Sequence, residues 1–164
     1  CSSDLKEALV TAMGEALVQD FGAAVSAALH AAAADGRRDC VGPRALREIL
    51  HRGVAALWSV IESTADRQLL AYEITAYSVR SAGAGPGIGM MQYRVMDTET
   101  ERFLEAAAEA SMMRWTEPMA SLTRSALATI DGVVLRWLVD QDTLAVIAEL
   151  DDLAARIAAK AVPA

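Results

Sequence analysis

Apolar residues recur every three or four positions through almost the whole chain, and this spacing constrains the fold more than any other feature. A period near 3.6 places such residues on one face of an α-helix. The spacing is clearest in two C-terminal stretches, at Leu122, Ala126, Ile130, Val133 and Trp137 and then at Leu144, Ile147, Leu150, Ala154 and Ile157. Alanine, a strong helix former, is the commonest residue. We therefore predict an all-α bundle of six helices and no strand.

Capping and turn residues divide this pattern into its helices. The predicted helices begin at Asp4, at Pro43, near Asp66, at Met90, at Pro118 and after Asp142. The first runs to Ala34, the third to about Ser81 and the fourth to Met113, and the last keeps its apolar pattern to Ala161. Four glycines and a proline predict a loop over 83–89, and the polar run 97–102 predicts an exposed or broken turn within the fourth helix.

Length, composition and charge limit the classes of function. With 164 residues, of which 54% are hydrophobic, the chain is expected to form one domain with a core that needs no metal or disulfide. The isolated cysteines Cys1 and Cys40 suit a reduced, cytoplasmic protein. Charged residues interrupt every apolar run, so we expect no membrane segment. The net charge of -7, without a basic stripe, argues against direct binding of nucleic acid.

The C-terminal third carries a resemblance to a known family. Residues 127–140, with the sequence LATIDGVVLRWLVD, are followed by Asp142 and a closing amphipathic helix. This arrangement resembles the two dimer-forming helices of tetracycline-repressor-like (TetR) transcriptional regulators. The opening residues Ser2, Ser3 and Asp4, before a long helix, are similar to the exit from that family's helix-turn-helix unit. The first residue is Cys1 rather than Met, which suggests that the chain is a fragment.

The resemblance implies that residues 1–164 form a single ligand-binding and dimerisation domain. The N-terminal helix-turn-helix domain is absent from this chain, so operator DNA would be a partner only through that missing part. The chain would form a homodimer, in which the last two helices of two copies make an intermolecular four-helix bundle. The ten apolar positions named first in this section would form that interface. Their alternative role is burial against the chain's own first helix.

In such a regulator, most often a repressor, a small and mostly apolar molecule binds among the middle helices. It shifts the setting of the first helix and so releases DNA. Methionine and aromatic side chains suit a cavity of this kind, although each could equally be ordinary core. Glu73 is the most suggestive polar member, as an acid next to Tyr72. The predicted ligand-binding residues are His51, Trp58, Tyr72, Glu73, Tyr77, Met91, Phe103 and Met113.

No pattern in the sequence predicts catalysis, a metal or a cofactor. Glu48 and His51 have the spacing of a di-iron half-site, but the second half-site is missing. Cys40 has no base nearby in the sequence, and the glycines of 83–89 do not fit a dinucleotide-binding fingerprint. Two alternatives stay open. One is a helical-bundle enzyme or small-molecule carrier unrelated to DNA, using Glu73, His51 and a methionine-rich cavity. The other is a structural homodimer without a ligand.

Overall fold

A computed structural model of the chain describes residues 41–80 and 87–164, together with 8, 12, 14–16, 19, 22–24 and 26–31. Residues 22–24 and 26–31 are helical. The predicted start at Asp4, the end at Ala34, both cysteines and most of the 83–89 loop lie outside the described residues. The longer elements are α2 (Pro43–Glu62), α3 (Ala65–Arg80), α4 (Ile88–Ser111), β1 (Met113–Trp115), α5 (Met119–Asp140), α6 (Thr143–Ala158) and β2 (Ala161–Pro163).

The predicted turn chemistry explains several of these boundaries. Gly42 has a φ of 93°, a left-handed conformation that glycine adopts easily, and it leads directly into Pro43 at the first position of α2. Asp142 caps α6, because its carboxylate accepts a hydrogen bond from the backbone N–H of Ala145 at 3.0 Å. Gln141 ends α5 in the left-handed region with a φ of 56°. The predicted starts of α2 at Pro43 and of α6 after Asp142 are therefore confirmed.

The polar run 97–102, predicted to be an exposed or broken turn, does not break the fourth helix, although Thr98 and Arg102 in it are exposed. Helix α4 runs without interruption from Ile88 to Ser111. Its polar side chains are satisfied along the helix itself: Arg102 pairs with Glu99 at 2.8 Å, and the hydroxyl of Thr98 donates to the backbone oxygen of Arg94 at 2.8 Å. Pairs three or four residues apart stabilise a helix, so a polar run need not end one.

The expectation of a strand-free fold is also wrong. Residues 113–115 and 161–163 form a two-stranded antiparallel sheet in which Met113 lies opposite Pro163 and Trp115 opposite Ala161. The N–H groups of Thr116 and Ala164 extend the pairing to the backbone oxygens of Lys160 and Met112. Met113 and Ala161 therefore belong to strands and not to helices.

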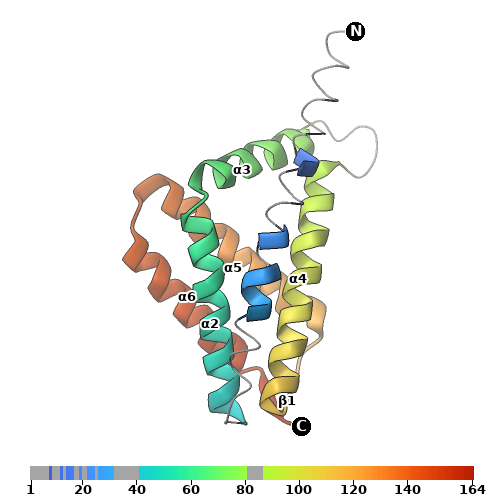
Figure 1. Ribbon diagram of the computed structural model, residues 1–164, viewed down its shortest axis with the longest axis vertical. Helices are drawn as coiled ribbons and strands as arrows, with labels where there is room; N and C mark the ends of the chain where they lie inside the picture. Colours follow the sequence, from blue (N-terminus) through green and yellow to red (C-terminus); the bar gives the residue numbers. More distant parts are fainter. Residues whose placement is uncertain are drawn as a thin grey trace.

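Figure 1 shows how the helices are arranged. Helix α2 packs against α6 and α4, α5 packs against α6 and α4, and α3 lies across the upper end against α4 and α5. The small sheet lies at the opposite end, near the C-terminus. The interior is formed by apolar side chains from α2, α4, α5 and α6, among them Leu46, Ile49, Leu104, Leu122 and Ala154.

The molecule is mostly helical, and α2 and α4 approach each other closely at Gly53. A Cβ atom on this residue would lie 2.2 Å from the ring of Phe103.

In the ranges that the structure describes, no helix has both the length and the apolar content needed to cross a membrane.

Candidate ligand-binding cavity

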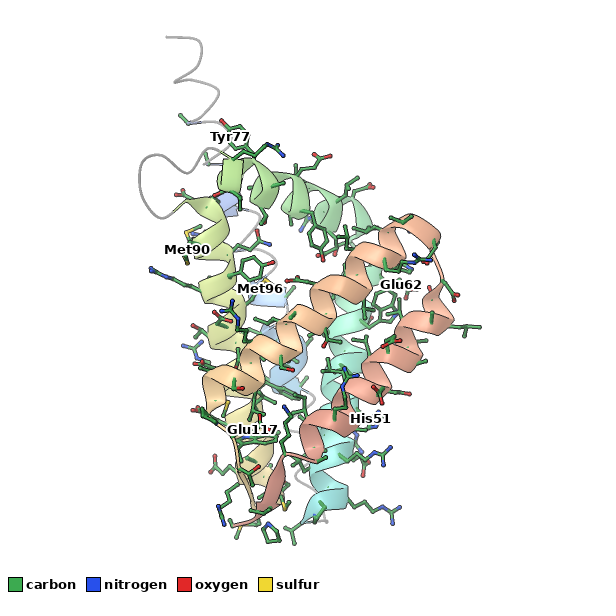
Figure 2. All side chains as sticks on the ribbon, turned by 180° about the vertical axis from the view of Figure 1, so that it is seen from behind. His51, Glu62, Tyr77, Met90, Met96 and Glu117 are labelled. Atoms are coloured by element: carbon green, nitrogen blue, oxygen red, sulfur yellow. The ribbon has the colours of Figure 1, made fainter. Side chains whose placement is uncertain are left out.

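A cavity lies where α2, α3, α4 and α5 meet. It comprises about 920 Å³ of space between atoms, a volume that includes solvent at its mouth. Most of its wall is apolar, and helical residues 22 and 29 from the N-terminal part of the chain contribute to it. The apolar side chains are Leu29, Leu57, Ile61, Ala71, Val95, Met96, Leu127, Ile130 and Val134. Figure 2 labels Met96, which lies on α4 toward α5.

Asp131 brings a half-buried carboxylate to this apolar wall. It shares a face of α5 with the buried residues Leu127 and Val134, at spacings of four and three. The hydroxyl of Tyr93 on α4 donates a hydrogen bond to Oδ2 of Asp131 at 2.7 Å. The hydroxyl of Tyr72 on α3 donates to the backbone oxygen of Asp131 at 3.0 Å. One residue of α5 thus holds two tyrosines from two other helices.

Burial governs the titration of this cluster. It raises the pKa of Asp131 above the ordinary value, and the hydrogen bond from Tyr93 partly offsets that rise. Burial, together with the hydrogen bond to Asp131, raises the pKa of Tyr93 to about 12. The pKa of Tyr72 is also raised, by burial first and then by the nearby charge of Asp131. Both phenols therefore remain protonated donors at neutral pH.

The other polar groups of the cavity are neutral, exposed or paired. Glu99 forms an ion pair with Arg102 at 2.8 Å. Arg67 is exposed, and the side-chain amide of Gln68 donates to the Thr64 hydroxyl at 3.0 Å. Gln92 accepts a hydrogen bond from the Thr75 hydroxyl at 3.2 Å. The described wall has two acidic residues, Glu99 and Asp131. Asp131 forms no ion pair with any described residue.

A second, smaller cavity lies next to the first. It comprises about 460 Å³ of space between atoms, open solvent included. Leu29, Leu57, Thr100 and Ile130 line both cavities, so the two cavities adjoin at these four residues. Apart from Thr100, the described wall of the second cavity is apolar, with Phe103, Leu153 and Ile157 among its members.

The structure brings few of the predicted ligand-binding residues together. Tyr72 lines the larger cavity and Phe103 the smaller. Trp58 is buried in the core, where its ring meets Trp137 edge to face with centroids 4.9 Å apart. Met113 is buried in β1, and Met91 is half-buried outside the described walls of both cavities.

Three polar or aromatic predictions need correction. Glu73 is exposed on α3, because the buried face of that helix carries Gln68 and Ile74. Tyr77 is also exposed, and Figure 2 shows it at the end of α3 that is remote from α5. His51 lies outside both walls and binds α6 instead, with Nδ1 of its ring 2.8 Å from Oδ1 of Asp151. Figure 2 shows His51 beside α6. Glu73 and His51 therefore do not meet at the cavity.

The predicted dimer seam also needs correction, because most of it is core. Seven of the ten side chains are buried within this one chain, which leaves them unavailable to a second copy: Leu122, Ala126, Ile130, Trp137, Leu150, Ala154 and Ile157. Val133 is half-buried, whereas Leu144 and Ile147 are exposed. The apolar residues that do face outward on the last two long helices are Leu135, Val139, Leu144 and Ile147.

The residue that organises the cavity was missed by the sequence prediction. Asp131 stood inside the stretch that carried the family resemblance, but it had no assigned role. A signal was present, since an acid spaced with Leu127 and Val134 falls on an apolar helix face. Tyr93 and Tyr72 could not be matched to it from the sequence, because that pairing depends on how three helices are offset.

No group of three or more His, Cys, Asp and Glu residues within the described ranges is arranged to hold a metal ion. Comparison of the chain with family models, with curated proteins and with solved structures finds no match.

Proposed function

We propose that this chain is the effector-binding and dimerisation domain of a TetR-like transcriptional regulator, a repressor whose DNA binding is released by a small, mostly apolar ligand. The observation that carries the proposal is the apolar cavity between α2, α3, α4 and α5. Sites for small molecules are typically concave and apolar, with a few placed polar groups, and Tyr72 and Asp131 are groups of that kind here.

Helical residues from the N-terminal part of the chain line the cavity, which supports an effect of ligand binding on the proposed DNA-binding domain. Leu29 lines both cavities, and a Cβ atom on Gly22 would lie 2.9 Å from the Val95 side chain on α4. A ligand that fits one setting of this segment better than another shifts the population toward that setting. In a dimer, such a shift changes the separation of two recognition helices, which must lie roughly 34–36 Å apart to read both half-sites.

The outward face of α5 supports dimerisation. Residues along this face are small or apolar and follow spacings of four and three: Ser121, Ser125, Ala128, Gly132, Leu135 and Val139. Val139 is 78% exposed and Leu144, at the start of α6, is 80% exposed, although both are large apolar side chains. Two copies related by a two-fold axis would cover these faces and complete a four-helix bundle.

Sedimentation velocity tests the dimer with a matched pair of variants. Gly132→Arg places a charge in the centre of the proposed interface, where a Cβ atom meets nothing within 4 Å, so the single chain tolerates it. Val79→Arg places the same charge on α3, at a site that is 72% exposed. We expect wild type and Val79→Arg to sediment as dimers and Gly132→Arg as a monomer. A monomeric wild type at high concentration would contradict this part of the proposal.

Calorimetric titration with octanol, a neutral apolar probe, tests the cavity. Ala71→Phe adds a ring to the wall of the larger cavity and is expected to weaken octanol binding at least tenfold by filling it. Ala76→Phe adds the same ring at an exposed site of α3, away from the described walls and from the proposed dimer face, and should leave binding unchanged. Failure of the wild type to bind octanol, or equal binding by Ala71→Phe, would contradict an apolar effector site.

The link to DNA has a direct test in the coding sequence upstream of Cys1. A basic helix-turn-helix unit in that sequence would support a regulator. A start codon within a few residues of Cys1 would contradict it and would leave a ligand-binding dimer without a DNA-reading part.

A further inference from the structure

We propose that the ligand of this cavity is a cationic amphiphile, an alkyl- or arylammonium whose charged nitrogen binds the carboxylate of Asp131 and whose tail extends toward the second cavity. This inference rests on the proposed function, because it uses the same cavity and adds the chemical class of the ligand. Two observations support it: the carboxylate of Asp131 lies on a mostly apolar wall, and the second cavity adjoins that wall.

The carboxylate of Asp131 has few hydrogen-bond donors around it. A carboxylate can accept about four hydrogen bonds. In the described part of the chain its side chain accepts one, from Tyr93 to Oδ2, and Oδ1 accepts none. A half-buried carboxylate with so few donors is costly, and an ammonium group would supply both the missing donors and the opposite charge.

The charges of the cavity wall set the sign of the ligand's charge. Glu99 is paired with Arg102, and Arg67, which also lines the cavity and has no ion pair in the described ranges, is exposed, so that water screens its charge. The half-buried charge of the described wall that lacks an opposite partner is therefore the negative charge of Asp131. The two phenols cannot compensate it, because both are neutral at neutral pH and both are already oriented toward Asp131. A neutral ligand would leave this charge unpaired, and an anion would be repelled by it.

The two adjoining cavities limit the shape of the ligand. Leu57 and Ile130 line both cavities, so the second cavity adjoins the first at these residues. Beyond them lie Phe103, Leu153 and Ile157, and this wall offers a bound molecule no charge. A ligand with its cation at Asp131 can place a flexible hydrocarbon tail past Leu57 into this space and so remove it from water. The pair of cavities thus suits a molecule with one charged end.

Three probes of equal length separate charge from hydrophobicity: octylamine, octanol and octanoate. Near neutral pH the amine is protonated, as lysine is, and octanoate is ionised. We expect octylamine to bind the wild type about ten- to a hundredfold more tightly than octanol, the range given by a net charge-assisted hydrogen bond. Octanoate should bind most weakly. Isothermal titration calorimetry measures all three affinities.

Asp131→Asn removes the charge and keeps an acceptor for the Tyr93 hydroxyl. In this variant octylamine should lose its advantage over octanol, while octanol binds as before. Glu99→Gln is the matched control, because it removes the other acid of the described wall, which Arg102 already neutralises. It should keep the preference for the amine. Circular dichroism verifies that both variants fold.

The outcomes separate this inference from the proposed function. Equal binding of amine and alcohol by the wild type, or a preference that survives Asp131→Asn, would overturn the cationic ligand and leave the apolar effector site intact. A preference abolished by Glu99→Gln and kept by Asp131→Asn would likewise overturn the role of Asp131. Absence of binding by all three probes would overturn both proposals.

Discussion

Asp131 is a half-buried acid whose burial is expected to reduce stability, at the position where we propose that a ligand binds. It occupies an inward position on α5, between the buried residues Leu127 and Val134, where an apolar side chain would pack at no electrostatic cost. Natural proteins tend to keep such local costs at binding sites, where the cost is repaid when a ligand arrives. The two tyrosines limit the cost by donating hydrogen bonds to the carboxylate and to the backbone of the same residue.

The free protein is therefore expected to be more stable with Asn at position 131. Since the folded-state pKa of Asp131 is raised, the native state binds its proton more tightly than the unfolded state does. Wild-type stability then falls as pH rises from the unfolded pKa of about 3.9 through the raised folded pKa, and the loss persists at neutral pH. Asp131→Asn should gain on the order of 0.5–1 kcal/mol at neutral pH, a figure reduced for solvent screening of a half-buried group.

Urea unfolding at a series of pH values measures this gain, which should shrink toward zero in acid. Asp140→Asn is the control of opposite sign. The pKa of Asp140 is lowered by the hydrogen bond from the backbone N–H of Asp142 and by Arg136, so its stabilisation is present above the unfolded pKa and lost as pH falls. This variant should lose stability at neutral pH. An Asp131→Asn variant that is less stable than wild type at neutral pH would show that the carboxylate has a stabilising partner.

At the scale of elements, two glycines in the middle of helices have opposite surroundings. Gly53 in α2 faces the ring of Phe103, and the close approach of α2 and α4 depends on its missing side chain. Gly132 in α5 faces open space. The same substitution at both sites therefore separates helix propensity from packing.

Gly132→Ala is expected to stabilise the chain by about 0.5–1 kcal/mol, because alanine restricts the unfolded state and favours a helix. Gly53→Ala should destabilise it by about 1–3 kcal/mol, since the new Cβ atom would lie 2.2 Å from Phe103 and would force the ring or the helix to move. Urea unfolding of both variants gives the two values. A stabilised Gly53→Ala variant would mean that the Phe103 ring swings into the adjoining cavity without cost.

Local sequence signals predicted α2, α3, α5 and α6, because apolar spacing and capping residues act within a few positions. The strands were missed for the opposite reason. Each has three residues, and Met113 pairs with Pro163 only because α5 and α6 return the chain to that point. The α5 and α6 seams were found correctly as apolar faces but assigned to the wrong neighbour, since periodicity tells which face is buried and not what buries it. For the same reason, periodicity alone did not identify Asp131 as a cavity residue, and Glu73 was predicted to be one although it is exposed.

At the scale of the whole molecule, α3 and the small sheet lie at opposite ends, and the larger cavity extends from α3 toward the middle of α4 and α5. Figure 1 shows α3, which closes the cavity, at one end and β1 at the other. The sheet joins the end of α4 to the end of α6, and Trp115 ties it to α4 through a hydrogen bond from its ring N–H to the backbone oxygen of Leu104 at 3.2 Å. The sheet therefore ties together the ends of α4 and α6, away from α3 and the proposed ligand contacts at Tyr72 and Asp131.

Removal of residues 161–164 should therefore weaken the fold without removing the binding site. The deletion takes away β2 and the hydrogen bond from the Ala164 N–H to the Met112 oxygen, and it uncovers the buried Met113. At about 1 kcal/mol for each lost backbone hydrogen bond, we expect a loss of about 2–4 kcal/mol in unfolding free energy. Deletion of Ala164 alone, as a control, should cost only about 1 kcal/mol.

Hydrogen exchange locates the effect of the longer deletion. Amides in the last turns of α4 and α6 should lose protection, whereas α3 and the part of α5 around Asp131 should keep theirs, because local stability follows local contacts. Octanol affinity should remain within about twofold of the wild type, since residues 161–164 contribute nothing to the described wall of either cavity. A loss of protection spread over all helices, together with lost binding, would show that the sheet and the cavity form one cooperative unit.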